Sequence, residues 1–191
     1  MHPAAGVSLV ELLIVMALVV IAAGAAWPLF AEPIDASRAR QAGAYLASSM
    51  RRARQEAVSR AASVAVVFDF SNGRWTMRLC ADGNGNGVRR TDLARADRCF
   101  DGPVDVAMLF PGVQFGVDGS LPDPDGGPGS TDPIRLGSSN MASFSATGSS
   151  SSGSVYVRSM NGSQYAVRLS GVTGRTRLLK YDTGTHAWIE I

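Results

Sequence analysis

Oxygen-bearing side chains alternate with glycines in the stretch Asp82-Gly83-Asn84-Gly85-Asn86-Gly87, where they could hold a metal ion. The candidate ligands are Asp82, Asn84, Asn86 and Asp92. Carboxylate and amide oxygens spaced in this way suit a hard cation such as Ca²⁺, and Gly87 permits the sharp turn that such a loop needs. The twelfth position, however, is Leu93 instead of a bidentate glutamate, and Arg89 and Arg90 add positive charge. The stretch therefore predicts either a calcium loop or a turn in which the side chains bond their own backbone.

Residues for covalent or acid–base catalysis are scarce in the rest of the chain. The only histidines are His2 and His186, and the sequence has no Gly-x-Ser-x-Gly motif, no His/Cys metal cluster and no phosphate-binding loop. Carboxylates cluster in expected loops, where nothing pairs them as an acid and a base. With 18% charged and 46% hydrophobic residues, the chain is neither disordered nor fibrous. The sequence thus predicts a globular protein that is not an enzyme and has no cofactor other than the candidate Ca²⁺.

One apolar segment, residues 7–30, is long enough to cross a membrane. Its 24 residues include a single charged side chain, Glu11, and as a helix they would extend about 36 Å. A carboxylate near the end of a membrane helix costs about 2–3 kcal/mol unless it is paired, so Glu11 is a candidate functional residue. The segment could be an uncleaved anchor or a cleaved signal peptide. Because MHPAAG has no Lys or Arg and the apolar run is too long, the signal peptide is disfavoured.

Small apolar residues predict that the helix continues over residues 34–61. Steps of three or four separate Ala39, Ala42, Leu46, Met50, Ala53 and Ala57. These steps place them on one narrow stripe, and their small size allows a sheet to approach closely. Six arginines occupy the other faces of the segment. We expect one long helix whose first half lies in a membrane and whose second half packs against a β domain.

Beyond Ala62 the pattern changes to a period of two, with turn signals between short segments. The expected strands are Ser63–Phe70, Arg74–Cys80, Val113–Val117, Ile134–Leu136, Ala142–Ala146, Val155–Met160, Gln164–Leu169, Arg175–Tyr181 and Ala187–Ile191. Hairpin turns are predicted at Asn72-Gly73 and Asn161-Gly162, and loops at 118–133 and 148–153. The sequence therefore predicts an α+β fold, with a long N-terminal helix packed on an antiparallel sheet or on two sheets.

The residues around Glu11 resemble a known processing site. Gly6-Val7-Ser8-Leu9-Val10-Glu11 is similar to the junction of type IV prepilins and type II secretion pseudopilins. The resemblance implies that a prepilin peptidase cuts between Gly6 and Val7 and methylates the new N-terminus. It also implies that Glu11 neutralises the terminal amine of a neighbouring subunit in the filament core, where paired opposite charges cost less than either charge alone. The sequence departs from the family pattern at two points: the leader has no Lys or Arg, and Val7 stands where Phe or Met is more common.

A second resemblance, to the GspH/FimT minor pilin family, covers most of the chain. Ala53-Arg54-Gln55-Glu56-Ala57 resembles a signature of that family, as do Leu109-Phe110-Pro111-Gly112-Val113 and the segments around Phe144 and Val155. The resemblance is weakest over residues 80–133. Arg54 and Glu56 themselves are expected on a solvated helix face. The implied organisation is a leader peptide at 1–6, a transmembrane or filament-core helix at 7–31, an amphipathic helix half at 32–62 and a globular β domain at 63–191.

Cys80 and Cys99 are the only two cysteines, with 18 residues between them. The resemblance implies a domain outside the inner membrane, in an oxidising compartment where two thiols usually pair. We therefore expect a disulfide, and closing a loop of this size contributes about 3 kcal/mol in the chain-entropy description. Two unpaired, half-buried thiols are the alternative. The spacing excludes a Cys-x-x-Cys redox pair.

The segment Gly174-Arg175-Thr176-Arg177 resembles the G-R-x-R motif with which DNA-uptake members of the minor pilin family contact DNA. In an extended chain, Arg175 and Arg177 project from one face about 6.5–7 Å apart, close to one phosphate spacing. Lys180 alternates to the other face and contributes to DNA binding only if the strand ends or twists early. The flanking charges are Arg158 and Arg168. Such contacts would carry no sequence preference, and a pair of solvated arginines on a sheet is the alternative.

Two functions follow from these resemblances. The first is a minor type IV pilin or pseudopilin that assembles into or primes a pilus-like filament and binds double-stranded DNA for uptake in natural transformation. The second is a minor pseudopilin of a type II protein secretion system without DNA binding. Both imply other major and minor pilins or pseudopilins, prepilin peptidase and the inner membrane as partners. Both also imply a single-pass inner-membrane protein whose C-terminal domain lies in the periplasm before it enters a pilus or pseudopilus.

Overall fold

The computed structural model describes residue 6 and residues 8–191, and for residues 25–32 it describes the backbone alone. The chain divides into two compact units, Met1–Ile34 and Asp35–Ile191. The expected leader 1–6, except for Gly6, and Val7 lie outside the described residues. The expected membrane helix 7–31 is therefore described only in part.

In the first unit, helix α1 (Leu9–Arg60) begins directly after Ser8. The backbone N–H of Glu11 donates a hydrogen bond to Ser8 Oγ at 3.1 Å, so Ser8 caps the N-terminus of the helix. The side chains of residues 8–24 are all exposed. Within the described residues, no helix is both long enough and apolar enough to span a membrane.

In the second unit, residues 35–60 of α1 bury the stripe that the sequence predicts. Its members Ala39, Ala42, Leu46, Met50, Ala53 and Ala57 are each at most 1% exposed. Gly43 lies beside this stripe, where a Cβ atom would come within 2.7 Å of Leu178 Cδ1. The absence of a side chain at Gly43 thus lets the helix approach a strand closely.

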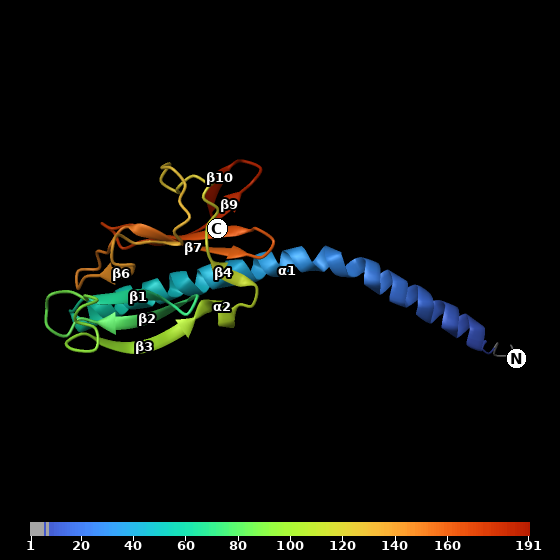
Figure 1. Cartoon of the computed structure of the whole chain (residues 1–191), viewed down its shortest axis with the longest axis horizontal. Helices are drawn as coiled ribbons and strands as arrows, with labels where there is room; N and C mark the ends of the chain where they lie inside the picture. The colour runs from blue at the N-terminus through green and yellow to red at the C-terminus, as the bar shows by residue number, and fades with distance from the viewer. Residues whose placement is uncertain (1–5, 7) are drawn as a thin grey trace, which may run out of the picture. The chain divides into compact units, whose positions relative to one another are not determined.

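The strands of this unit form two antiparallel sheets (Figure 1). The first has the order β3-β2-β1-β6, with β1 (Val64–Ser71), β2 (Arg74–Ala81), β3 (Arg98–Asp105) and β6 (Met141–Phe144). The second has the order β10-β9-β8-β7-β4, and β5 also pairs with β7. Its strands are β4 (Val113–Phe115), β5 (Ile134–Arg135), β7 (Gly153–Ser159), β8 (Gln164–Leu169), β9 (Thr176–Asp182) and β10 (Ala187–Glu190). A short helix, α2 (Val106–Leu109), precedes β4.

Residues 35–60 of α1 share one hydrophobic core with both sheets. The core includes Leu46 from the helix, Phe68 from the first sheet and Val167 from the second. Each sheet therefore has an inner face toward α1 and an outer face away from it. The outer face of the first sheet packs against Val88, and that of the second packs against Val117. The fold is α+β with two antiparallel sheets, as the sequence predicts.

The hairpin turns also lie where they are expected. Asn72 and Gly73 join β1 to β2, and both have positive φ, 52° and 75°. Asn161-Gly162 lies in the connection 160–163 between β7 and β8, where Gly162 has a φ of 87°. Strand β3 and helix α2 were not expected. The sequence Arg98–Asp105 does not alternate and contains Gly-Pro, and β3 tolerates this because it is an edge strand whose pairing with β2 shifts register.

Candidate functional site

The first candidate site is the junction before α1. Gly6 is exposed, and a Cβ atom added to it would meet nothing within 4 Å. Nothing in the described fold therefore requires glycine at this position, so a requirement for Gly6 would come from an enzyme that reads the junction. Glu11 is exposed in the first turn of α1, where a carboxylate interacts favourably with the helix dipole. Val7, the other residue of the predicted cleavage site, lies outside the described residues.

The second candidate site is the arginine pair at the start of β9. Arg175 and Arg177 both approach the carboxylate of Glu190, with Nη2–Oε1 at 2.9 Å and Nη1–Oε2 at 3.9 Å, respectively. Glu190 lies on the neighbouring strand β10. The sequence did not point to it, because it is 13 or more residues away from the two arginines and only the pairing of the strands brings them together. The two guanidinium groups thus converge on one anion. Lys180 lies on the opposite face of β9, since it alternates with Arg177 and shares a side with the core residue Leu178.

Gly174, which opens the arginine motif, is held against α1. Its φ is +62°, and a Cβ atom there would lie 2.3 Å from the carbonyl oxygen of Gly148 and 2.7 Å from Arg54 Nε. Arg54 Nε donates a hydrogen bond to that same carbonyl oxygen at 2.9 Å. Arg54 is exposed, as expected for a solvated helix face, but its side chain also binds this loop carbonyl, a contact that the sequence did not predict. Its neighbour in the motif, Glu56, pairs with Arg60 along the helix at 2.8 Å.

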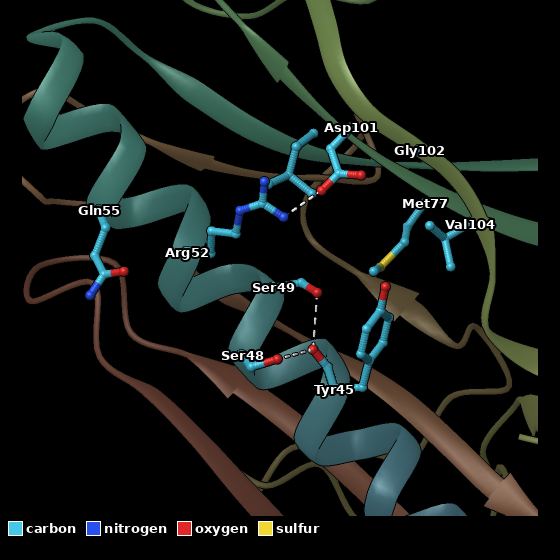
Figure 2. A pocket seen from close by; sticks show the side chains of 10 residues that line it. Tyr45, Ser48, Ser49, Arg52, Gln55, Met77, Asp101, Gly102 and Val104 are labelled. Carbon is cyan, nitrogen blue, oxygen red and sulfur yellow. Dashed lines mark hydrogen bonds and ion pairs between the residues drawn. The ribbon is translucent and has the colours of Figure 1, made fainter. Parts of the chain in front are cut away.

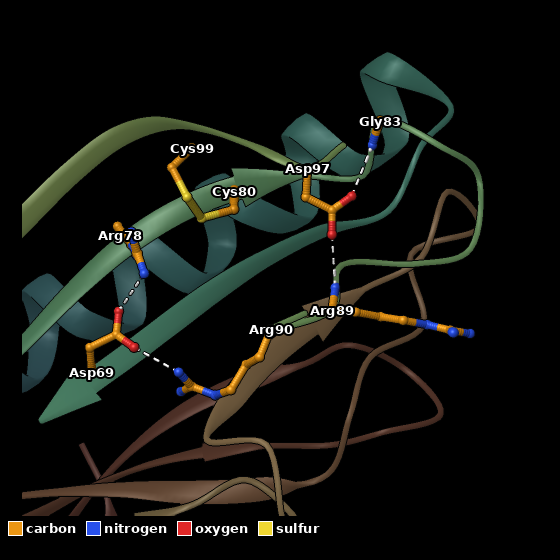
Figure 3. Close-up of a disulfide and its surroundings, with 8 residues drawn as sticks. All are labelled: Asp69, Arg78, Cys80, Gly83, Arg89, Arg90, Asp97 and Cys99. Carbon is orange, nitrogen blue, oxygen red and sulfur yellow. Dashed lines mark hydrogen bonds and ion pairs between the residues drawn. A yellow bond between two sulfur atoms is a disulfide. The ribbon is translucent and has the colours of Figure 1, made fainter. Parts of the chain in front are cut away.

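Cys80 and Cys99 form the expected disulfide, which joins directly opposite positions of β2 and β3 (Figure 3). The loop that it closes contains a fully buried carboxylate, Asp97. Asp97 accepts hydrogen bonds from the backbone N–H groups of Gly83 and Arg89, at 3.2 and 2.9 Å. These bonds satisfy both oxygens of the buried carboxylate from within the loop.

The side chain of Arg90 leaves this loop and binds the first sheet. It pairs with Asp69 at 2.6 Å, and Asp69 also pairs with Arg78 of β2 at 2.9 Å (Figure 3). Arg90 further donates to the carbonyl oxygens of Phe68 and Ser139. Arg90 therefore anchors the loop to the sheet, and Asp69 compensates its charge.

Within the candidate calcium stretch, carboxylates accept hydrogen bonds from the loop itself. Asp82 accepts from the backbone N–H groups of Asn84, Gly85 and Gly87, and Asp92 accepts from the side-chain NH₂ groups of Asn84 and Asn86. Burial raises the pKa of Asp82, but these backbone bonds outweigh burial and hold the pKa below its usual value. Bonds from Asn86 and Asn84 lower the pKa of Asp92.

This bonding matches the Asx-turn alternative, because Ca²⁺ would need amide oxygens from Asn84 and Asn86 in place of their NH₂ groups. Across the described residues, no three His, Cys, Asp or Glu side chains come together as a metal site.

A pocket of about 350 Å³ lies between α1 and strands β2 and β3 (Figure 2). The ring of Tyr45 points toward Met77, and Arg52 forms an ion pair with Asp101. Ser48 and Ser49 donate to the carbonyl oxygen of Tyr45, at 2.7 and 3.0 Å. The polar side chains of this pocket that come from α1 are thus largely engaged with their own helix and with β3.

Comparison with known proteins gives two family matches. Residues 42–174 match the family described as type II transport protein GspH, and residues 1–27 match the prokaryotic N-terminal methylation motif. The first match includes Arg54 and the disulfide and ends at Gly174, so Arg175, Arg177 and Lys180 lie beyond it. The second includes Gly6, Val7 and Glu11, and it implies a membrane-anchored protein of the pilin type. No curated protein and no solved structure was found to match the chain.

Proposed function

Because this chain belongs to the family of type II transport protein GspH, we propose that it is a minor pseudopilin or pilin that enters or primes a pilus-like filament. The observation that carries the proposal is the methylation motif at residues 1–27 on a chain whose residues 42–174 match that family. The role is structural, as in the pilin and pseudopilin families, and no reaction is assigned to the chain.

Maturation is proposed to use the exposed junction before α1. A prepilin peptidase hydrolyses the peptide bond between Gly6 and Val7 and methylates the amine of Val7. Residues 1–6 leave as the leader, and residues 7–31 anchor the protein in the inner membrane with the domain 63–191 in the periplasm. The disulfide supports this placement, because disulfides persist in oxidising compartments.

Glu11 is proposed to bind the terminal amine of a neighbouring subunit. Its carboxylate is exposed in the first turn of α1 and has no ion-pair partner among the described residues. In the apolar centre of a filament, an amine and a carboxylate that are buried together cost far less than either alone. The family implies contacts with other pilins or pseudopilins, and this pair would set the register of one such contact.

The test is incorporation of Glu11→Gln into filaments sheared from cells that hold the peptidase and the other subunits. Glu56→Gln is the matched control, because it makes the same chemical change on the same helix and breaks only the pair with Arg60. We expect Glu11→Gln to be cleaved normally but to be lost from the sheared fraction, and Glu56→Gln to incorporate like the wild type. Equal incorporation of both variants would contradict the role of Glu11.

The machine that holds the protein is proposed to be a type II secretion system or a type IV pilus. The family description favours the first, and the arginine motif at residues 174–177 favours the second. Deletion of the gene separates them, because loss of protein secretion identifies the first and loss of natural transformation identifies the second.

Duplex DNA binding is a second candidate function, and one observation favours it. Arg175 and Arg177 hold the Glu190 carboxylate between them, and a phosphate group could take the place of that anion. The side chain of Arg175 is 66% exposed, so the exchange needs little movement of the sheet. Lys180, on the other face of β9, would add only long-range attraction.

The test of this candidate compares two double variants of equal charge. Arg175→Ala/Arg177→Ala should lose most of the micromolar affinity for duplex DNA at low salt. Arg51→Ala/Arg95→Ala removes two exposed arginines elsewhere and should lose little. Equal affinity of the two double variants would reject the motif.

A further inference from the structure

A row of arginines crosses the outer face of the second sheet. The strand register places Arg135 of β5 opposite Ser154 of β7, Ser154 opposite Arg168 of β8, and Arg168 opposite Arg177 of β9. We call Arg135, Arg168 and Arg177 the arginine row. Adjacent strands lie about 4.8 Å apart, so the three side chains follow one line across four strands. Residues adjacent in sequence to the row, such as Ile134, Val167 and Leu178, belong to the core on the inner face, which fixes the row on the outer face.

Each member of the row faces a carboxylate, and two of the three carboxylates come from a loop instead of from the sheet. Arg135 pairs with Asp123, Arg168 pairs with both oxygens of Asp125, and Arg177 approaches Glu190. Asp123 and Asp125 both come from residues 118–133, which we call the acidic loop.

Two further contacts fasten the acidic loop to the sheet. Trp188 Nε1 donates to the carbonyl oxygen of Pro122 at 2.7 Å, and the Tyr156 hydroxyl donates to Asp123 at 3.2 Å. The loop contains no regular secondary structure. Its two ends are also anchored to the sheet: the Asp118 N–H donates to Gln164 Oε1 at 3.1 Å, and the carbonyl oxygen of Pro133 accepts from the Tyr156 N–H at 2.8 Å. Ion pairs that stay in contact with solvent contribute little net stability, so other anions can replace the carboxylates that pair with the row.

Space for such an anion already exists between the loop and the row. A polar cavity of about 340 Å³ is lined by Asp123, Asp125, Gly127, Arg135, Ser154 and Arg168. Ser154 is 1% exposed, and its Oγ has no hydrogen-bond partner among the described residues. A buried hydroxyl without a partner is unfavourable, and the strand register places this one between Arg135 and Arg168. It could donate to an oxygen of a bound phosphate.

We infer that the arginine row is a binding surface for the phosphodiester backbone of a nucleic acid, and that the acidic loop covers it as an internal substitute for phosphate. Asp123 and Asp125 occupy the positions of two phosphates until a nucleic acid displaces the loop. The inference rests on the proposed DNA candidate and extends its surface from the pair at residues 175 and 177 across the sheet to Arg135. It also makes binding conditional on loop displacement.

The experiment measures binding of a labelled DNA duplex to the full chain in detergent at low salt. Asp123→Asn/Asp125→Asn frees two arginines of the row. Asp118→Asn/Asp132→Asn is the matched control, because it removes the same charge from the same loop, and these carboxylates bond Ser120 and the backbone N–H of Ile134, not arginines. We expect the first variant to bind about tenfold more tightly than the wild type, and the control to change by less than about threefold. An equal gain in both variants, or no gain in the first, would overturn the inference.

A second measurement keeps the inference testable if the variant is poorly folded. Amide hydrogen exchange of residues 118–133 in the wild-type chain should accelerate when duplex DNA is added, and unchanged exchange would contradict displacement of the loop. Polyglutamate serves as the competing polyanion. If it displaced the loop as well as DNA does, an acidic protein segment would be the ligand and the inference would fail.

The filament role is measured separately, by incorporation into sheared filaments, and none of these outcomes alters it.

Discussion

The Nε atom of Arg54 donates a hydrogen bond to the carbonyl oxygen of Gly148 at 2.9 Å, across 94 positions of sequence. The same side chain lies against Gly174, so Arg54 contacts both the connection between β6 and β7 and the turn between β8 and β9. One of these loops leads into the arginine pair at the start of β9. The structural role of Arg54 is thus to hold the candidate DNA-binding segment against α1.

Replacing Arg54 by Ala should lower the free energy of unfolding by about 1–2 kcal/mol, because the Gly148 carbonyl loses its partner. Arg51→Ala is the control, since Arg51 is exposed on the same helix and such surface changes stay within about 0.5 kcal/mol. Urea unfolding of the full chain in detergent measures both. Equal midpoints for the two variants would show that the Arg54 contact contributes nothing.

A companion prediction concerns the glycine that Arg54 covers. Gly174→Ala adds a Cβ atom 2.3 Å from the Gly148 carbonyl oxygen, and it also places alanine at positive φ. Gly73→Ala shares the positive φ but meets nothing within 4 Å. The Gly73 variant should lose about 1 kcal/mol of stability from backbone strain alone. The Gly174 variant should lose about 1–3 kcal/mol more from the clash, and a similar loss in both would argue against it.

Removal of the disulfide should destabilise the second unit. Cys80→Ser/Cys99→Ser opens a loop with 18 residues between its ends, which is expected to cost about 3 kcal/mol. Urea unfolding with and without a reductant provides the measurement. The wild type should also show no free thiol before reduction, and alkylation of both cysteines in the native, unreduced protein would contradict the bond.

Acid should weaken the loop 82–97 through two depressed pKa values. Hydrogen bonds hold the pKa of Asp82 and of Asp92 below that of the unfolded chain. A depressed folded-state pKa gives stability that is present above about pH 4 and is lost as the pH falls through the folded value. Asp92→Asn cannot titrate, so its stability should fall less steeply below pH 4 than that of the wild type. Identical slopes in acid unfolding would rule out this contribution.

The sequence predicted those parts of the fold that local patterns encode. The stripe from Ala39 to Ala57 is buried as its spacing predicts, and Asn72-Gly73 forms the turn that its conformational freedom favours. Strand β3 escaped prediction because its residues follow no alternation and become a strand only through pairing with β2 and through Cys99. Tertiary contacts, not propensity, define such an edge strand.

The candidate sites also differ in whether a local sequence pattern predicts them. The junction at Gly6 and Glu11 is a local motif, so the sequence alone points to it. The pairing of Arg175 and Arg177 with Glu190, and of Arg168 with Asp125, depends on which strands and loops meet. The spacing of these residues in the sequence does not predict which strands and loops come into contact. The arginine row can be recognised only when the register of the four strands is known.

The most direct test of the pilin-like role is the intact mass of the protein from cells that hold a prepilin peptidase. The wild type should begin at Val7, lack MHPAAG and carry a methyl group on its N-terminus. Gly6→Ala should keep the leader, although the described fold has room for a Cβ atom at Gly6, and Gly24→Ala, which also has room, should be cut normally. A wild-type protein that still begins at Met1 in such cells would contradict the account.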